Sequence, residues 1–183
     1  MDSVFIIVDM VNDFLRPEGK LSFPKGAEAI PPIARLKAAF RAAGVPVVYD
    51  NDAHPKDSKE FETWPPHCLM GSWGARIVDE LAAAPGDIIF HKDSLTFFYN
   101  GSAEKLLRGL GATHLYVAGV ATEYCVKGCV LDALDRGFAV TVIGDAIAGV
   151  DLKPGDTDQA LTAMGQAGAS FATTEEVLEK LGR

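Results

Sequence analysis

The sequence has few cysteines and no long apolar run. Three cysteines in 183 residues, an odd number, do not fit the paired framework of a small secreted domain, so a reducing cytoplasm is expected. The first apolar run, at 4–8, lies between Asp2 and Asp9. It is too short for a membrane span or for the apolar region of a signal peptide. We therefore expect a soluble cytoplasmic protein that does not contact membranes.

Basic residues are also scarce. The chain has 17 Lys and Arg against 25 Asp and Glu, a net charge of −8 at pH 7. No basic stripe offsets this acidity, so nucleic acid is not an expected partner. No G-x-G-x-x-G run follows the first apolar segment, which removes the usual dinucleotide fingerprint. Without repeats or linkers, residues 1–183 are expected to form a single domain.

Short apolar runs alternate with amphipathic segments along the chain. The runs expected to be strands are 4–8, 45–49, 87–90, 115–118, 138–143 and, more weakly, 169–172. The segments expected to be helices are 27–43, 74–81, 106–110, 126–136, 157–167 and 174–181. Near-continuous apolar strands are typical of a parallel sheet covered on both faces. The sequence thus predicts a three-layer α/β/α fold with a mostly parallel, roughly six-stranded sheet.

The segment 119–125, Gly-Val-Ala-Thr-Glu-Tyr-Cys, is the most informative part of the chain. It places Cys125 in the first turn of a helix that starts at the carboxyl end of a strand. Free backbone N–H groups and the helix dipole favour a thiolate there and lower the thiol pKa below its usual ~8.5. Cys125 is therefore a candidate nucleophile. The alternative is a small apolar residue buried under the helix.

Charged residues follow other strands at the same expected edge of the sheet. Asp9 follows the first strand, and Lys92 follows the third. An acid at this edge can take the thiol proton, and an ammonium group favours both thiolate and carboxylate. Taken alone, Asp9 is equally consistent with a turn cap and Lys92 with a solvated strand end. Their convergence with Cys125 indicates a nucleophilic site.

The loop 50–72 is long for a simple connection and carries half of the four histidines. Asp52 and His54 are two residues apart, so they lie on the same side of an extended chain. His67 follows two prolines and completes a set of two imidazoles and one carboxylate. This set suits one divalent metal ion, with zinc expected first and iron or manganese as alternatives. Glu60 is a candidate further ligand, directly or through water. Loop histidines without a metal are the competing interpretation.

Three separated motifs resemble those of the isochorismatase-like cysteine hydrolases, and within that family the nicotinamidases. They are the stretch Val-Asp-Met-Val-Asn-Asp-Phe at 8–14, the metal loop with Trp-Pro-Pro-His-Cys at 64–68, and the nucleophile motif at 119–126. The resemblance spans nearly the whole chain. It implies that Asp9 deprotonates Cys125 with support from Lys92, and that the thiolate attacks an amide carbonyl to give a thioester.

The resemblance also implies how the substrate is held. The backbone N–H groups of Ala121 and Cys125 would form the oxyanion hole, and the peptide bond between the two residues before the threonine would be cis. The metal would bind a pyridine nitrogen and so orient the ring. The side chains expected to contact the substrate are Phe14, Trp64, Val120 and Tyr124.

Three functions are compared. The first is hydrolysis of nicotinamide to nicotinic acid and ammonia. The second keeps Asp9, Lys92 and Cys125 but acts on another small amide or a ureido or carbamoyl compound, with the metal structural or absent. It stays open because the match to the family is loose over 92–98, a segment that lines the pocket in relatives. The third is a non-catalytic flavodoxin-like ligand-binding module. A small-molecule substrate and a homo-oligomer, dimer or tetramer, are expected.

Overall fold

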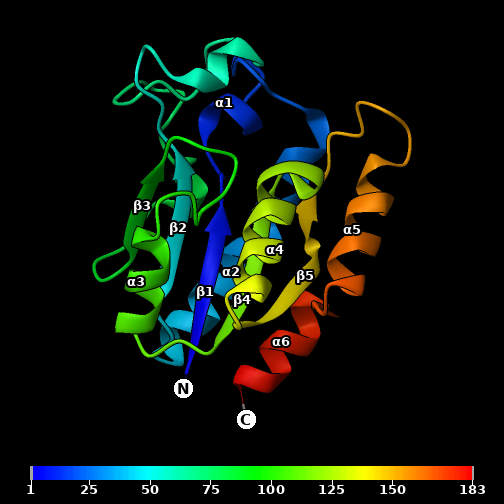
Figure 1. Cartoon of the computed structure of the whole chain (residues 1–183). Coiled ribbons are helices and arrows are strands. Elements are labelled where there is room, and N and C mark those ends of the chain that lie inside the picture. Colours follow the sequence, from blue (N-terminus) through cyan, green and yellow to red (C-terminus); the bar gives the residue numbers. More distant parts are fainter. Residues whose placement is uncertain (1, 183) are drawn as a thin grey trace.

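The computed structural model of the chain describes residues 2–182, and six strands form one sheet (Figure 1). The spatial order is β3-β2-β1-β4-β5-β6, and every neighbouring pair is parallel. The strands are β1 (Ser3–Val8), β2 (Val47–Asp52), β3 (Ile88–Lys92), β4 (His114–Val120), β5 (Ala139–Ala148) and β6 (Ser170–Ala172). The α/β fold with a parallel six-stranded sheet, predicted from the alternation of apolar runs, is confirmed.

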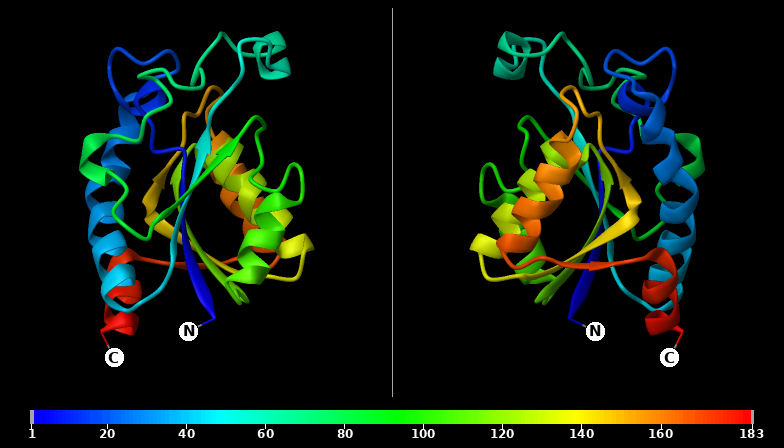
Figure 2. Two further views of the ribbon diagram at one scale, coloured as in Figure 1. Left: turned by 90° about the vertical axis from the view of Figure 1, so that its left-hand side faces the viewer. Right: turned by 90° about the vertical axis from the view of Figure 1, so that its right-hand side faces the viewer.

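Helices cover both faces of this sheet (Figure 2). The α-helices are α1 (Asn12–Leu15), α2 (Ile30–Ala42), α3 (Ser102–Gly109), α4 (Lys127–Asp135), α5 (Asp156–Gln166) and α6 (Thr174–Leu181). In both views α2 and α6 lie on one side of the strands, and α3, α4 and α5 lie on the other. Short 3-10 turns occupy Pro24–Ala29, Lys59–Glu62 and Asp79–Leu81. Within residues 2–182, no helix is long and apolar enough to span a membrane.

Strand β1 shows why the apolar runs are continuous. Phe5 and Ile7 belong to the core under α2, whereas Val4, Ile6 and Val8 belong to the core on the opposite face. Successive side chains of a strand point to opposite faces, so a strand covered on both faces must be apolar at every position. The sheet therefore has two cores, and only the strand ends are free to carry polar groups.

The helix predicted at 74–81 is wrong, since only the 3-10 turn Asp79–Leu81 forms there. The carbonyl oxygens that a helix would use are engaged elsewhere: Gly74 accepts from the N–H of Asp13, and Arg76 accepts from the N–H of Asn12. The segment is thus bonded to α1 rather than to itself. Pattern alone does not show this competition, because the bonding partners lie far away in sequence.

Two further differences concern the strand ends that matter for chemistry. Strands β2 and β3 run to Asp52 and Lys92, so these residues end their strands instead of following them. The chain after β4 forms a π-helical turn, Thr122–Val126, before α4 begins, so Cys125 does not lie in the first turn of an α-helix.

Gly119 allows β4 to approach β1 closely at that edge. Its φ is 125°, and a Cβ atom built there would lie 2.1 Å from the carbonyl oxygen of Val8. Only glycine avoids this overlap and adopts this φ without strain. The turn that carries Cys125 therefore begins directly beside the residue that follows β1, which is Asp9.

Candidate active site

Three side chains from separate strands meet at one buried point. Asp9 follows β1, Lys92 ends β3, and Cys125 lies in the π-helical turn after β4. The Nζ of Lys92 donates to Oδ1 and Oδ2 of Asp9 at 2.8 and 2.7 Å. The Sγ of Cys125 lies within 4.8 Å of carboxylate oxygens of Asp9 and Asp52. The convergence predicted from parallel strand ends is therefore present, with Lys92 reaching across β2.

Lys92 is surrounded by carboxylates. Its Nζ also donates to Oδ1 of Asp52 at 2.6 Å and lies 3.6 Å from Oδ1 of Asp50. Burial opposes the charge of Lys92, but Asp50, Asp52 and Asp9 together outweigh it and hold its pKa well above the ordinary value. The ammonium group is therefore permanently charged and neutralises the carboxylates around it.

Asp50 is a buried acid that sequence reasoning left without a role. It is fully buried, and within residues 2–182 neither of its carboxylate oxygens has a hydrogen-bond partner. Burial is the main cause that raises its pKa well above the ordinary value, and Asp9 and Asp52 add to the shift. Asp50 therefore keeps its proton to a higher pH than an ordinary carboxyl group does.

Asp9 is tuned to accept a proton near neutral pH. Burial, helped by the negative charge of Asp52, raises its pKa to about 6, while Lys92 acts in the opposite direction. A general base works best when its pKa lies near the working pH. Asp9 is therefore a carboxylate at pH 7 that can still hold a transferred proton.

The predicted lowering of the Cys125 pKa is wrong. Burial and the neighbouring Asp9 raise the pKa of this thiol well above its usual value, and the opposing effect of Lys92 is smaller. The side chain is only 6% exposed. Cys125, the candidate nucleophile, is therefore a neutral thiol beside a carboxylate that can take its proton.

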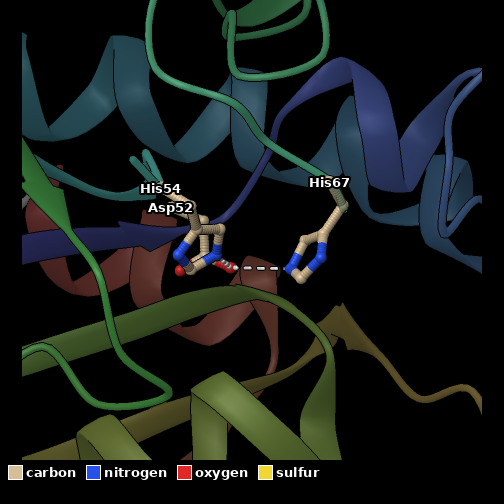
Figure 3. Close-up of side chains that lie close together, drawn as sticks. All are labelled: Asp52, His54 and His67. Atoms are coloured by element: carbon tan, nitrogen blue, oxygen red, sulfur yellow. Dashed lines mark ion pairs between the residues drawn. The ribbon is translucent and has the colours of Figure 1, made fainter. Parts of the chain in front are cut away.

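A second group, Asp52, His54 and His67, lies beside this centre (Figure 3). Nε2 of His54 is 3.5 Å and Nε2 of His67 is 3.9 Å from Oδ2 of Asp52. All three side chains are buried. Lys92 and His54 outweigh the effect of burial and lower the pKa of Asp52, so it is a carboxylate. The predicted set of ligands is thus brought together.

The hydrogen bonds of the two imidazoles test whether a metal ion fits. Nδ1 of His54 lies 2.7 Å from Oδ1 of Asp93, and Nδ1 of His67 lies 2.8 Å from the carbonyl oxygen of Pro65. Both acceptors favour a proton on Nδ1, which leaves a lone pair on each Nε2. Nε2 of His54 is buried without a hydrogen-bond partner in the described part of the chain. Two lone pairs and a carboxylate facing one another fit a divalent cation.

The loop folds back on itself to bring His67 to His54. The N–H of His54 donates to the carbonyl of Cys68, and the N–H of Met70 donates to the carbonyl of His54, both at 2.9 Å. Oδ2 of Asp13 accepts the N–H of Cys68 at 2.6 Å, which ties this part of the loop to α1. Sequence reasoning gave Asp13 no role, although it lies in the motif around Asp9.

A cavity of about 300 Å³ opens onto both centres. The predicted substrate contacts Phe14, Trp64 and Tyr124 line it, and the rings of Trp64 and Tyr124 meet edge to face at 5.4 Å. Val120 does not line it, because its side chain is fully buried in the core on the α2 side. Glu60 also lines the cavity but lies outside the cluster of candidate metal ligands.

Sequence reasoning missed part of the cavity wall. Val150 and Leu152 line the cavity from the loop that follows β5. Oε1 of the buried Glu123 accepts the backbone N–H groups of Val150 and Asp151 at 2.9 and 2.7 Å, which holds that loop in place. The apolar run at 138–143 predicted a shorter strand, whereas β5 continues to Ala148. The sequence pattern therefore did not place Val150 and Leu152 just beyond a strand end.

The backbone around the nucleophile has the expected form. The Val120–Ala121 peptide bond is cis, as the resemblance implied. The carbonyl of Ala121 accepts the N–H of Tyr124 at 3.0 Å and that of Val126 at 3.2 Å, which closes the π-helical turn. The first N–H groups of a helical turn have no partner within it. Ala121 and Cys125 both line the cavity.

Solved structures of amidases share this architecture. A pyrazinamidase of Pyrococcus horikoshii in complex with zinc has a TM-score of 0.87 at 33% identity, and the match covers 94% of this chain and 99% of that one. An N-carbamoylsarcosine amidase from Thermoplasma acidophilum has a TM-score of 0.85 at 30% identity, with 96% and 98% covered. The chain thus has the α/β fold of these two amidases.

The family follows from the sequence comparison. The profile of the isochorismatase domain matches residues 3–176, so the chain belongs to the isochorismatase family of hydrolases. A nicotinamidase of Escherichia coli (strain K12) is 33% identical, and the match covers 97% of each chain. Membership in this family argues against the flavodoxin-like binding module considered above.

Proposed function

We propose that the protein is a metal-dependent cysteine amidohydrolase that converts nicotinamide to nicotinic acid and ammonia. The observation that carries this proposal is that Cys125, Asp52 and His67 line the same cavity. A pyridine ring with an amide substituent needs a nucleophile for one end and a Lewis acid for the other. Here a thiol and candidate ligands for a metal ion lie within one cavity.

Asp9, Lys92 and Cys125 carry the chemistry in this proposal. Asp9 takes the thiol proton as Sγ of Cys125 bonds to the amide carbon, and Lys92 keeps the carboxylate in position. The N–H groups of Ala121 and Cys125 stabilise the oxyanion, and each such donor typically contributes about 10²–10³-fold in rate.

The same acid then completes the turnover. Asp9 passes its proton to the departing nitrogen, so ammonia leaves and the thioester remains. A water molecule attacks the thioester carbon and gives a proton to Asp9, and the C–S bond breaks to release the carboxylic acid. The thiol regains its proton from Asp9 and the site returns to its starting state.

Asp52, His54 and His67 would hold one divalent ion, which supplies a Lewis-acid contact for the pyridine nitrogen. We propose zinc, because two imidazoles and a carboxylate suit it and because the similar pyrazinamidase was solved with zinc. Glu60 lines the same cavity and would act only through a bound water. Phe14, Trp64 and Tyr124 would form the walls around a flat ring.

A second substrate class is favoured by one observation. Lys20 lines the cavity and is exposed to it. An ammonium group there would pair with the carboxylate of a carbamoyl or ureido acid. The similarity to an N-carbamoylsarcosine amidase at 30% identity points the same way.

The test is ammonia release by the full chain loaded with zinc, with nicotinamide and N-carbamoyl amino acids as separate substrates. We expect turnover of nicotinamide that disappears in Cys125→Ala. The matched control is Cys129→Ala, because this buried cysteine lies in α4 and does not line the cavity. No ammonia from nicotinamide, with turnover of the carbamoyl acids, would assign the second class instead.

A further inference from the structure

Asp93 contacts His54 without belonging to the group of candidate metal ligands. It directly follows Lys92 at the end of β3. Its Oδ1 lies 2.7 Å from Nδ1 of His54 and accepts the hydroxyl of Ser58 at 2.5 Å. It belongs to the segment 92–98, where the sequence matches the family only loosely.

The contact decides which nitrogen of His54 can bind a metal. A neutral imidazole carries one proton, and a carboxylate at Nδ1 can only accept, so the proton belongs on Nδ1. Nε2, which faces Oδ2 of Asp52 at 3.5 Å, then presents a lone pair. The His54 side chain is 1% exposed, and its Nε2 has no hydrogen-bond partner among the described residues, so the 2.7 Å contact of Nδ1 with Asp93 decides where the proton lies.

His67 provides an internal comparison. Its Nδ1 lies 2.8 Å from the carbonyl oxygen of Pro65, a neutral acceptor supplied by its own loop. His54 instead uses a charged acceptor supplied by the sheet. A carboxylate behind a ligating imidazole fixes its orientation and raises its basicity, and loss of such a partner typically costs about 10–100-fold in metal affinity.

Ser58 extends the contact into the loop. Its Oγ donates to Asp93 and accepts the N–H of Glu60 at 3.2 Å, which caps the 3-10 turn Lys59–Glu62. One carboxylate at the end of β3 thus holds both His54 and the turn that carries Glu60. The loop is tied to the rigid sheet at the point where its first histidine leaves β2.

We infer that Asp93 is a positioning residue that holds His54 with its proton on Nδ1 and its Nε2 lone pair directed at the metal position. The role of this lone pair in metal binding rests on the proposed function. The orientation itself does not. Lys92 and Asp93, neighbours in sequence, would then serve the nucleophile centre and the metal cluster respectively.

The test compares Asp93→Ala and Asp93→Asn with Asp57→Asn in the full chain. Asp57 is an exposed acid in the same loop, so its variant matches the change in charge of Asp93→Asn. Zn²⁺ affinity is measured by competition with a chromophoric chelator. We expect Asp93→Ala to bind Zn²⁺ about 10–100-fold more weakly, Asp93→Asn to lose less because its amide oxygen still accepts, and Asp57→Asn to match the parent chain. Equal affinity in Asp93→Ala and Asp57→Asn would overturn the inference.

A second readout does not depend on activity or on metal binding. Imidazole ¹⁵N spectra of the same proteins report which nitrogen of His54 carries the proton. In the parent chain and in Asp57→Asn, we expect a signal from a proton on Nδ1 of His54. In Asp93→Ala, we expect this signal to be lost, or the proton to be shared between Nδ1 and Nε2. If the parent chain binds no Zn²⁺, the proposed function fails and these spectra still decide the role of Asp93. An unchanged His54 signal in Asp93→Ala would refute it.

Discussion

The nucleophile centre and the metal cluster are built from different kinds of backbone. Asp9, Lys92 and Cys125 come from the ends of β1, β3 and β4, so the register of the sheet places them. His54 and His67 lie in the loop after β2, and backbone bonds between His54 and residues 68–70, together with side-chain contacts, hold that loop. The first centre is thus ordered by the fold itself, and the second depends on a few polar bonds.

Asp52 belongs to both regions. Its Oδ1 accepts from Lys92 at 2.6 Å, and its Oδ2 faces the two histidines. One carboxylate therefore links the charge balance of the nucleophile centre to the donor set of the metal cluster. Changes in either region test how independent the two are.

The largest expected effect is on turnover. Cys125→Ala removes the nucleophile and is expected to lower kcat by on the order of 10⁴–10⁶-fold, as for other covalent catalysts. Bound zinc should stay at the level of the parent chain, because Cys125 is not part of the Asp52, His54 and His67 group. Ammonia release and metal content of the purified variant check both points. Loss of zinc together with activity would show that the two regions are not separable.

Lys92→Met is expected to damage both regions. It leaves the buried carboxylates of Asp9 and Asp52 without their cation, and breaking a buried pair costs about 3–5 kcal/mol. Urea unfolding should show this loss in the free energy of unfolding, and zinc affinity should change because Asp52 loses its cationic partner. Lys153→Met, at an exposed position, is the control and should leave stability unchanged. A stable Lys92→Met protein with normal zinc affinity would contradict the shared charge balance.

Asp13→Ala is expected to affect the metal loop and to leave the nucleophile centre unchanged. It removes the acceptor for the N–H groups of Cys68 and Lys20, which lie at 2.6 and 3.1 Å from its carboxylate oxygens. A buried N–H left without a partner costs about 1–3 kcal/mol, so His67 loosens and zinc affinity falls roughly tenfold. The rate of Cys125 alkylation should not change. A change in the alkylation rate as large as the change in zinc affinity would mean that the loop and the sheet edge are structurally coupled.

The smallest effect concerns pH. Asp9 must be a carboxylate to accept the thiol proton, and burial with Asp52 raises its pKa to about 6 from 3.8. Activity is therefore present above about 6 and lost as the pH falls through that value, by roughly tenfold per unit in kcat/KM. A pH–rate profile of the zinc-loaded protein measures this limb. A limb near 4 would show that Asp9 is not the base or that its burial is relieved on substrate binding.

Prediction from the sequence succeeded where local pattern was sufficient. The helix α6 matches the predicted bounds 174–181, since Thr173 and Glu176 form a capping box at its start. It failed at 74–81, where carbonyl groups bond to α1 rather than within a helix. It also placed Val120 at the substrate, because sequence distance from Cys125 does not show which face of β4 a side chain takes.

The sequence by itself determined the chemical groups and the alternation of strands and helices, because both are local properties of residue type and spacing. Only the tertiary structure decided which groups meet. Lys92 reaches Asp9 because β3 is only one strand away from β1, and Asp93 faces His54 because β2 and β3 pair with Asp52 opposite Lys92. The raised pKa of Cys125 likewise depends on burial and on a carboxylate far away in sequence. Such energies depend on distances across the fold, which no local pattern encodes.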